Sequence, residues 1–192
     1  MPNSVISNFH HRLLPLYAPR AEALLQRVNP DDLNHLNFRY IFTVDGMISI
    51  SHIIEDAITK NAKVADAHVS FQYMSRFTAQ AARYANVAQA SKGLWLYGAF
   101  DAELPSLPNT TLIDTENTAL LDYWYLVAYG PGIHMTLLAE EITPEDRMEG
   151  EARLYEGFYT FDPDTAYQLL NILHQSYPQD VPAPIPPEML ED

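Results

Sequence analysis

Seven histidines and 25 acidic residues are the side chains of this 192-residue sequence that could hold a metal ion or transfer protons. The histidines are His10, His11, His35, His52, His68, His134 and His174. They form no HxH or HxxxH spacing, and His10 and His11 lie in a stretch that we expect to be an extended arm. His68 and His134 fall on expected strands, where a hydrogen-bonded structural histidine is more common than a ligand. We therefore expect no metal cofactor.

Four carboxylates stand where strands are expected to end, at Asp101, Glu103, Glu140 and Glu141. Side chains alternate along a strand, so Glu140 and Glu141 should point to opposite faces, and an inward one would acquire the raised pKa of a catalytic acid. A strand end in solvent is the more common arrangement. The sequence has no GxSxG, GxGxxG or phosphate-loop motif and no Cys. We expect no catalytic residues, and a hydrolase or isomerase is only a third alternative.

Aromatic side chains are concentrated on the expected strands, and the chain has 12 tyrosines and two tryptophans. Those that face one side of a sheet would form a layer beneath the helices, which in most proteins is simply core. If helices leave part of the layer uncovered, it becomes a concave apolar site with polar edges that suits a flat organic ligand. We predict such a site at Trp95, Tyr97, Trp124, Tyr129 and Phe158.

A hairpin within Leu121–Glu141 is the element that must position many of these side chains. Two apolar runs, Tyr123–Tyr129 and Ile133–Ala139, flank Gly130-Pro131-Gly132, whose residues favour a turn. Both runs are apolar at nearly every position, which is typical of strands covered on both faces. The pattern predicts the centre of a sheet.

The remaining pattern predicts one α/β domain with a mixed sheet and helices on both faces. Further strands are expected at 38–44, 67–73, 94–99, 110–114 and 153–160, and helices at 21–28, 50–58, 78–91 and 163–177. The first three strands should pair largely in parallel, and the others antiparallel. A turn at Asp45-Gly46 should precede the helix at 50–58, with Ser49 or Ser51 as its cap.

The net charge of −14, from 25 acidic against 11 basic residues, limits the partners. Nucleic-acid binding needs clustered Lys and Arg, and none is visible, so we expect no nucleic acid and no anionic membrane surface as partner. No apolar run approaches the ~20 residues of a membrane span, and the N-terminus lacks the pattern of a secretory signal. We expect a cytoplasmic protein.

Five segments, in this order and spacing, resemble the DICT domain. They are Ser49–Ile58, Phe71–Ala85, Leu94–Phe100, Asp122–Glu141 and Leu154–Ala166, and the resemblance spans about residues 38–177. It implies a sensory or input domain, of the kind that accompanies diguanylate cyclases and two-component systems, is common in cyanobacteria and is linked to light-related signalling. It implies no catalytic residues.

We accordingly expect an arm with a short helix at 1–30, a DICT-like sensory domain at 31–177, and a disordered, Pro-rich acidic tail at 178–192. If this is the whole protein, its output must pass through association with a signalling protein, such as a histidine kinase or diguanylate cyclase, or with itself. The alternative is a ligand-free adaptor that acts through protein interaction or dimerisation.

Overall fold

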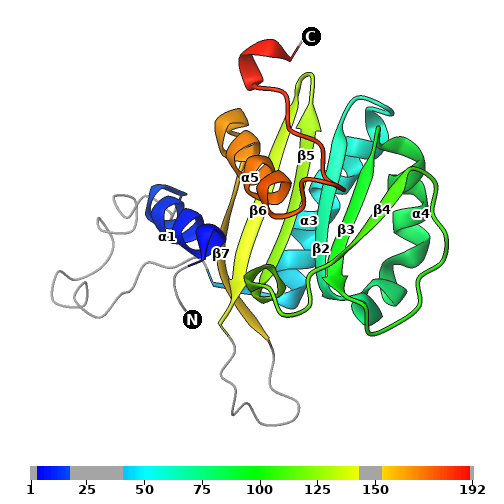
Figure 1. The fold of residues 1–192 in the computed structure, drawn as a ribbon, viewed down its shortest axis with the longest axis horizontal. Coiled ribbons are helices and arrows are strands. Elements are labelled where there is room, and N and C mark those ends of the chain that lie inside the picture. Colours follow the sequence, from blue (N-terminus) through cyan, green and yellow to red (C-terminus); the bar gives the residue numbers. More distant parts are fainter. Residues whose placement is uncertain (1–3, 18–40, 143–152, 191–192) are drawn as a thin grey trace, which may run out of the picture.

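A single mixed sheet organises the computed structural model, which describes residues 4–17, 41–142 and 153–190 (Figure 1). Its seven strands have the order β1-β7-β6-β5-β2-β3-β4. They are β1 (Ile41–Thr43), β2 (Asp66–Tyr73), β3 (Leu94–Ala99), β4 (Thr110–Asp114), β5 (Tyr123–Gly130), β6 (Ile133–Glu141) and β7 (Leu154–Thr160). The predicted α/β domain with a mixed sheet is confirmed.

The predicted hairpin lies at the centre of this sheet. β5 and β6 pair antiparallel from Tyr123↔Glu140 to Gly130↔Ile133, so that Pro131 and Gly132 make the turn. Gly132 has a φ of +66°, in the left-handed region that only glycine adopts without strain. Because β5 also pairs with β2, and β6 with β7, both hairpin strands are interior.

Two predicted strand directions are wrong. β1 pairs antiparallel with β7 at the sheet edge, although we expected it to join the parallel strands. β4 pairs parallel with β3, although we expected it to be antiparallel. The alternation within a strand fixes which face each side chain occupies, but it carries no information on the direction of the neighbouring strand.

Four α-helices of the described residues cover the two faces: α1 (Val5–Tyr17), α3 (Val44–Lys60), α4 (Ala81–Ala90) and α5 (Pro163–Ser176). The 3-10 turns are η2 (Met74–Gln80), η3 (Ala119–Asp122) and η4 (Pro187–Met189). α3 begins earlier than predicted: its N-cap is Thr43, which accepts a hydrogen bond from the Gly46 N–H, and the expected turn at Asp45-Gly46 is its first turn. The predicted helix at 78–91 starts as η2 and continues as α4.

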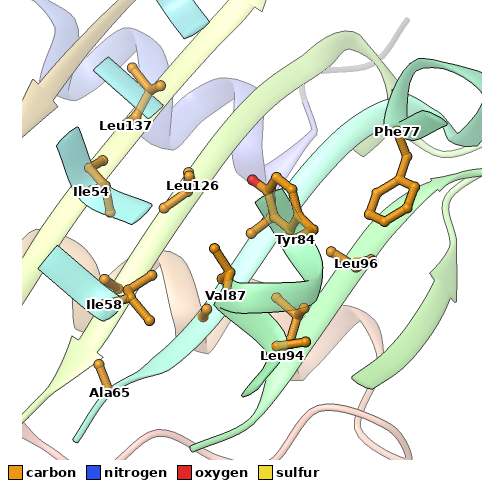
Figure 2. Packing of buried hydrophobic residues seen from close by; sticks show 14 of the residues in the cluster. Ile54, Ile58, Ala65, Phe77, Tyr84, Val87, Leu94, Leu96, Leu126 and Leu137 are labelled. Carbon is orange, nitrogen blue, oxygen red and sulfur yellow. The ribbon is translucent and has the colours of Figure 1, made fainter. Parts of the chain in front are cut away.

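Each face of the sheet has its own core. On one face α3 and α4 pack on the strands, and Figure 2 shows the interlocking side chains, among them Ile54, Ile58, Tyr84 and Leu126. On the other face α1 and α5 cover a second cluster that includes Tyr125 and Leu169. Figure 1 shows α5 in front of the sheet and α3 behind it.

The chain ends differ from the sequence expectation. Residues 5–17 form α1, where an extended arm was expected, and Ile6, Phe9 and Leu13 bury their side chains in the second core. Pro15 stands inside α1 and removes one helix hydrogen bond, but the helix continues to Tyr17. The predicted helix at 21–28 lies outside the described residues.

The segment from Pro178 to Leu190 is also ordered against the sheet, where a disordered tail was expected. Val181 is 1% exposed in the second core. The indole N–H of Trp95 donates to the Asp180 carbonyl (2.9 Å), and the Tyr129 hydroxyl donates to the Ile185 carbonyl (2.7 Å). The division of the chain at residues 30 and 177 stays a prediction.

Candidate functional site

A cavity of about 260 Å³ lies between α3, η2–α4 and the sheet, and we call it the α3–α4 cavity. It is lined mainly by apolar atoms and by the following residues: Val44, Ile48, Ser51, His52, Glu55, Val69, Ser70, Phe71, Arg76, Ala79, Gln80, Tyr84, Trp124 and Arg153. A concave apolar site with a few polar groups is the usual form of a small-molecule pocket.

A β-bulge in β2 shapes the rim of this cavity. The register of β2 with β3 shifts between Ser70 and Gln72, and Gln72 has a φ of +61°. A left-handed conformation costs a residue with a side chain roughly 1–2 kcal/mol. Bulges commonly stand beside functional sites, where they redirect a side chain.

The redirected Gln72 side chain is the centre of a polar network at the rim. Its amide N–H donates to Glu141 (3.1 Å), and its amide oxygen accepts hydrogen bonds from Arg76 and from the Tyr155 hydroxyl (3.1 Å). Arg153 in turn donates to the Tyr155 hydroxyl (2.9 Å). Burial, and next the nearby positive charge of Arg153, lower the pKa of Arg76. Two guanidinium groups therefore share this rim.

Two buried polar atoms of the cavity lining have no hydrogen-bond partner among the described residues. They are the hydroxyl oxygen of Ser51 and the Nε2 of His52, both on α3. An unsatisfied buried polar group costs about 1–3 kcal/mol, so most such groups in native proteins find a partner. A ligand in the cavity would supply one.

Glu55, by contrast, is fully engaged in joining α3 to α4. It is 2% exposed, accepts a hydrogen bond from the Tyr84 hydroxyl (2.7 Å) and pairs with the Arg83 guanidinium. Arg83 also donates to the His52 carbonyl (3.0 Å). Burial, and next the charge of Glu55, raise the pKa of Tyr84 well above its usual value. This arrangement holds the two helices at a fixed spacing beside the cavity.

The five predicted site residues are divided between the two faces of the sheet. Trp124 lines the α3–α4 cavity. Trp95 and Tyr129 line a second cavity of about 380 Å³ on the other face, between the sheet and residues 182–185, which we call the C-terminal cavity. Tyr97 and Phe158 are fully buried in the second core. The structure does not bring all five residues together. Their assignment to a ligand site stays a prediction.

The C-terminal cavity contains a stacked histidine. The rings of His68 and Trp95 lie 4.4 Å apart with an angle of 3° between their planes. The Nδ1 of His68 is 2.8 Å from the Tyr97 hydroxyl. Burial lowers the pKa of His68 to about 3, so the ring is neutral near pH 7. His68 thus has the structural role that its place on a strand indicates.

The four candidate acids have separate surroundings. Asp101 accepts hydrogen bonds from the Ser75 N–H (2.8 Å) and hydroxyl (2.6 Å), which lower its pKa. Glu103 is exposed. Glu140 and Glu141 point to opposite faces, as predicted: Glu140 lies beside α1 and Glu141 joins the Gln72 network. Burial raises the pKa of Glu140.

Sequence reasoning missed Ser51, His52, Arg76 and Arg153 as cavity residues. Only for Ser51 does the sequence contain a signal. Ser51 and Glu55 stand four residues apart on the buried stripe of α3, between Met47 and Ile58. A polar residue on an otherwise apolar helix face indicates either a buried network or a site. No local pattern marks the two arginines, since the bulge and the strand pairing place them.

Comparison with known proteins gives one family and a general fold. The sequence model of a family described as "Sensory domain in DIguanylate Cyclases and Two-component system" (DICT) matches residues 33–142, more than half of the chain. No curated protein matches. Within the described ranges, every helix is too short or too polar to span a lipid bilayer.

Two solved structures are similar at low sequence identity. Polyphosphate kinase from Porphyromonas gingivalis shares 10% identity at a TM-score of 0.50, over 88% of this chain and 31% of the kinase chain. NucT from Helicobacter pylori shares 9% at a TM-score of 0.45, over 74% of this chain and 97% of its own. The chain thus spans about a third of the kinase, and the likeness to the kinase extends to the fold alone.

Proposed function

The chain belongs to the DICT family of sensory domains, and we propose that it is an input domain of bacterial signal transduction that binds a small aromatic ligand with an anionic group in the α3–α4 cavity. The observation that carries this proposal is the pair of unpartnered polar atoms, Ser51 Oγ and His52 Nε2, in a lining made mainly of apolar atoms. The apolar walls, which include Trp124, suit a flat ring system.

The preference for an anionic group follows from the charges at the rim. Among the described residues of the rim, Arg76 and Arg153 stand against the carboxylate of Glu141, which lies 3.8 Å from Arg76. Guanidinium groups recognise carboxylates and other oxyanions through paired hydrogen bonds. A carboxylate or sulfonate on the ligand would reduce the repulsion between the two arginines.

The signal would leave through the helices that cover the cavity. A ligand that separates α3 from α4 acts on the Glu55–Arg83–Tyr84 contacts that hold them together. The outer surfaces of these helices then change their fit to a partner, which we propose is a histidine kinase, a diguanylate cyclase or a second copy of the chain. Sedimentation with and without ligand measures the change in self-association.

The two tryptophans make the ligand site directly testable. In Trp95→Phe the only tryptophan is Trp124, which lines the α3–α4 cavity, and in the matched variant Trp124→Phe it is Trp95, which lines the C-terminal cavity. We expect 1-anilinonaphthalene-8-sulfonate, an aromatic anion, to quench Trp124 fluorescence saturably and more strongly than Trp95 fluorescence, because energy transfer to the probe falls steeply with distance. Stronger quenching of Trp95 than of Trp124 would indicate a site on the other face and overturn the proposal.

The anionic preference has its own control. Arg76→Gln should weaken binding of the sulfonate probe at least about tenfold, whereas N-phenyl-1-naphthylamine, the same rings without the sulfonate, should bind as before.

Ser51→Leu, which fills the cavity with a residue that favours helix, should abolish binding of both probes. Native mass spectrometry of freshly isolated protein should show a bound small molecule that Ser51→Leu lacks, and a bare polypeptide in both would contradict the proposal.

A further inference from the structure

Three side chains of metal-ligand type meet where α1 lies against the end of β6, on the sheet face opposite the α3–α4 cavity. They are His10 and His11 of α1 and Glu140 of β6, and one ligand atom from each lies within 4.8 Å of the others. His10 Nδ1 and His11 Nε2 are 3.6 and 3.7 Å from the same oxygen, Oε2 of Glu140. Ligand atoms of a tetrahedral zinc centre with bonds of about 2.1 Å are roughly 3.4 Å apart, so small shifts would close the site.

Hydrogen bonds on the far side of each ring fix which nitrogen can bind a metal. His10 Nε2 is 3.0 Å from the backbone carbonyl of Glu156, and His11 Nδ1 is 2.8 Å from that of Ser7. A carbonyl only accepts hydrogen bonds, so in the neutral rings these two nitrogens carry the protons. The free lone pairs are then on His10 Nδ1 and His11 Nε2, the atoms that face Glu140. Metal-ligating histidines are typically oriented by this kind of second hydrogen bond.

The buried nitrogen of His10 gives independent support. The His10 side chain is 0% exposed, and its Nδ1 has no hydrogen-bond partner among the described residues. The 3.6 Å separation from Glu140 is too long for a hydrogen bond. A buried acceptor of this kind is rare in native proteins, and a bound cation at the centre of the cluster would satisfy it.

We infer that His10, His11 and Glu140 bind a divalent first-row transition-metal ion, for which Zn²⁺ is the best match. Two imidazoles and one carboxylate form a ligand set that zinc accepts, and three protein ligands leave the fourth position for water. The side chains of His11 and Glu140 are 58% and 27% exposed, so this position is open to solvent.

The bound ion ties α1 to the sheet. α1 supplies Ile6, Phe9 and Leu13 to the second core, so metal binding adds directly to the stability of that face. The sequence reasoning expected no metal because the histidines have no HxH or HxxxH spacing and because it placed His10 and His11 in an extended arm. The helix carries them to β6, more than 120 residues away in the sequence.

Titration of the metal-free, untagged chain tests the site. Zn²⁺ added to EDTA-treated protein should bind one ion per chain in calorimetry and should raise the melting temperature. His11→Gln and Glu140→Gln change partly exposed side chains, so both should fold, and each should weaken Zn²⁺ binding at least about tenfold. The matched control is His134→Gln, also on β6 but outside the cluster, which should bind Zn²⁺ like the unaltered chain.

Co²⁺ in place of Zn²⁺ gives a second readout, because a tetrahedral site produces visible absorption bands that loosely bound surface ions lack. The bands should appear in the unaltered chain and in His134→Gln, and be absent from Glu140→Gln. Equal Zn²⁺ affinity in all four proteins, or no binding by the unaltered chain, would overturn the inference. Neither result affects the proposal for the α3–α4 cavity on the other face.

Discussion

Burial alters the chemistry of individual side chains on the central strands, and His68 is the clearest case. Its pKa is lowered to about 3 by burial, against about 6.5 in an unfolded chain. As the pH falls below about 6.5, the unfolded chain takes up a proton that the native state cannot accept. The native state therefore loses about 1.4 kcal/mol per pH unit down to about pH 3, and this contribution is absent above pH 6.5.

His68→Gln removes the titrating group and should reduce the acid sensitivity of the fold. Between pH 7 and pH 4.5 the free energy of unfolding of the unaltered chain should fall by about 2–3 kcal/mol more than that of the variant. Urea denaturation at the two pH values measures the loss of unfolding free energy in each protein. The difference between the two losses is free of the contribution of the carboxylates, which are common to both proteins. Equal losses in the two proteins would show that His68 does not remain neutral in the native state.

Glycines are required at single positions where the strands approach closely, and Gly157 of β7 is one of them. A Cβ at this position would lie 2.3 Å from the Leu138 carbonyl oxygen and 2.4 Å from the Ala139 Cβ. Gly157→Ala should therefore destabilise the protein by about 1–3 kcal/mol. Gly46→Ala is the matched control, because its Cβ meets nothing closer than 3.6 Å and it stands in the first turn of α3.

The control should be neutral or stabilise the protein by up to about 1 kcal/mol, because alanine favours helix over glycine. Thermal unfolding of the two variants against the unaltered chain measures both effects. If Gly157→Ala were as stable as Gly46→Ala, the close pairing of β6 and β7 at this position would be wrong.

At the scale of elements, residues 178–190 act as a strap across the second core. Val181 is 1% exposed, and the His174 Nδ1 donates to its carbonyl (2.7 Å). Val181→Ala removes two buried methyl groups and should cost about 1–2 kcal/mol of stability. Ile185→Ala, in the same segment but 50% exposed, should cost less than about 0.5 kcal/mol.

Chemical denaturation of these two variants distinguishes an ordered strap from a loose tail.

A second test uses the Trp124→Phe variant, in which Trp95 is the fluorescent reporter of the strap, because its indole N–H donates to the Asp180 carbonyl. Its emission should shift toward that of exposed tryptophan when residues 179–192 are deleted. An unchanged emission and equal stability of Val181→Ala and Ile185→Ala would contradict the packing of the strap.

The elements that sequence reasoning predicted are those with local signals. The hairpin has turn residues between two apolar runs, α5 has Asp162 as its N-cap and Pro163 at its first position, and α3 has a regular apolar stripe. α1 carries a comparable stripe at Ile6, Phe9 and Leu13, but Pro15 lies inside this helix and opposes a helix prediction from local sequence. The strap is held by contacts across as many as 85 residues, which no local pattern records.

The ligand site predicted at five aromatic residues stays a prediction. The alternation of side chains sends Trp124 to one face of the sheet and Trp95 to the other, where they line separate cavities. Residues 123 to 129 contribute to both faces in turn, so a list of aromatic residues does not define one site. The meeting of His10, His11 and Glu140 could not be predicted for a related reason, because it depends on α1 forming and packing beside β6.

For the whole molecule, the two cores share the strands that separate them. Along β5, Leu126 and Ala128 face the α3–α4 side, whereas Tyr125, Val127 and Tyr129 face the α1–α5 side. Neither core can be lost without unpairing strands that the other core needs. The described sheet should therefore unfold as one cooperative unit, although ligand and metal are proposed to bind on opposite faces.

The single-tryptophan variants measure this cooperativity, because Trp124 packs against the α3–α4 core and Trp95 against the α1–α5 core. In Trp95→Phe and in Trp124→Phe, the fluorescence transition in urea should coincide with the far-ultraviolet circular dichroism transition of the same variant, with the same slope. Comparison within each variant removes the effect of the substitution on stability. A Trp95 transition at clearly lower urea would show that α1, α5 and the strap form a separately unfolding layer. A ligand of the native state stabilises the whole unit that it binds to. If that layer unfolds separately, Zn²⁺ bound at His10, His11 and Glu140 should raise the urea midpoint of the Trp95 transition alone. If the molecule is cooperative, Zn²⁺ should raise the urea midpoints of both transitions.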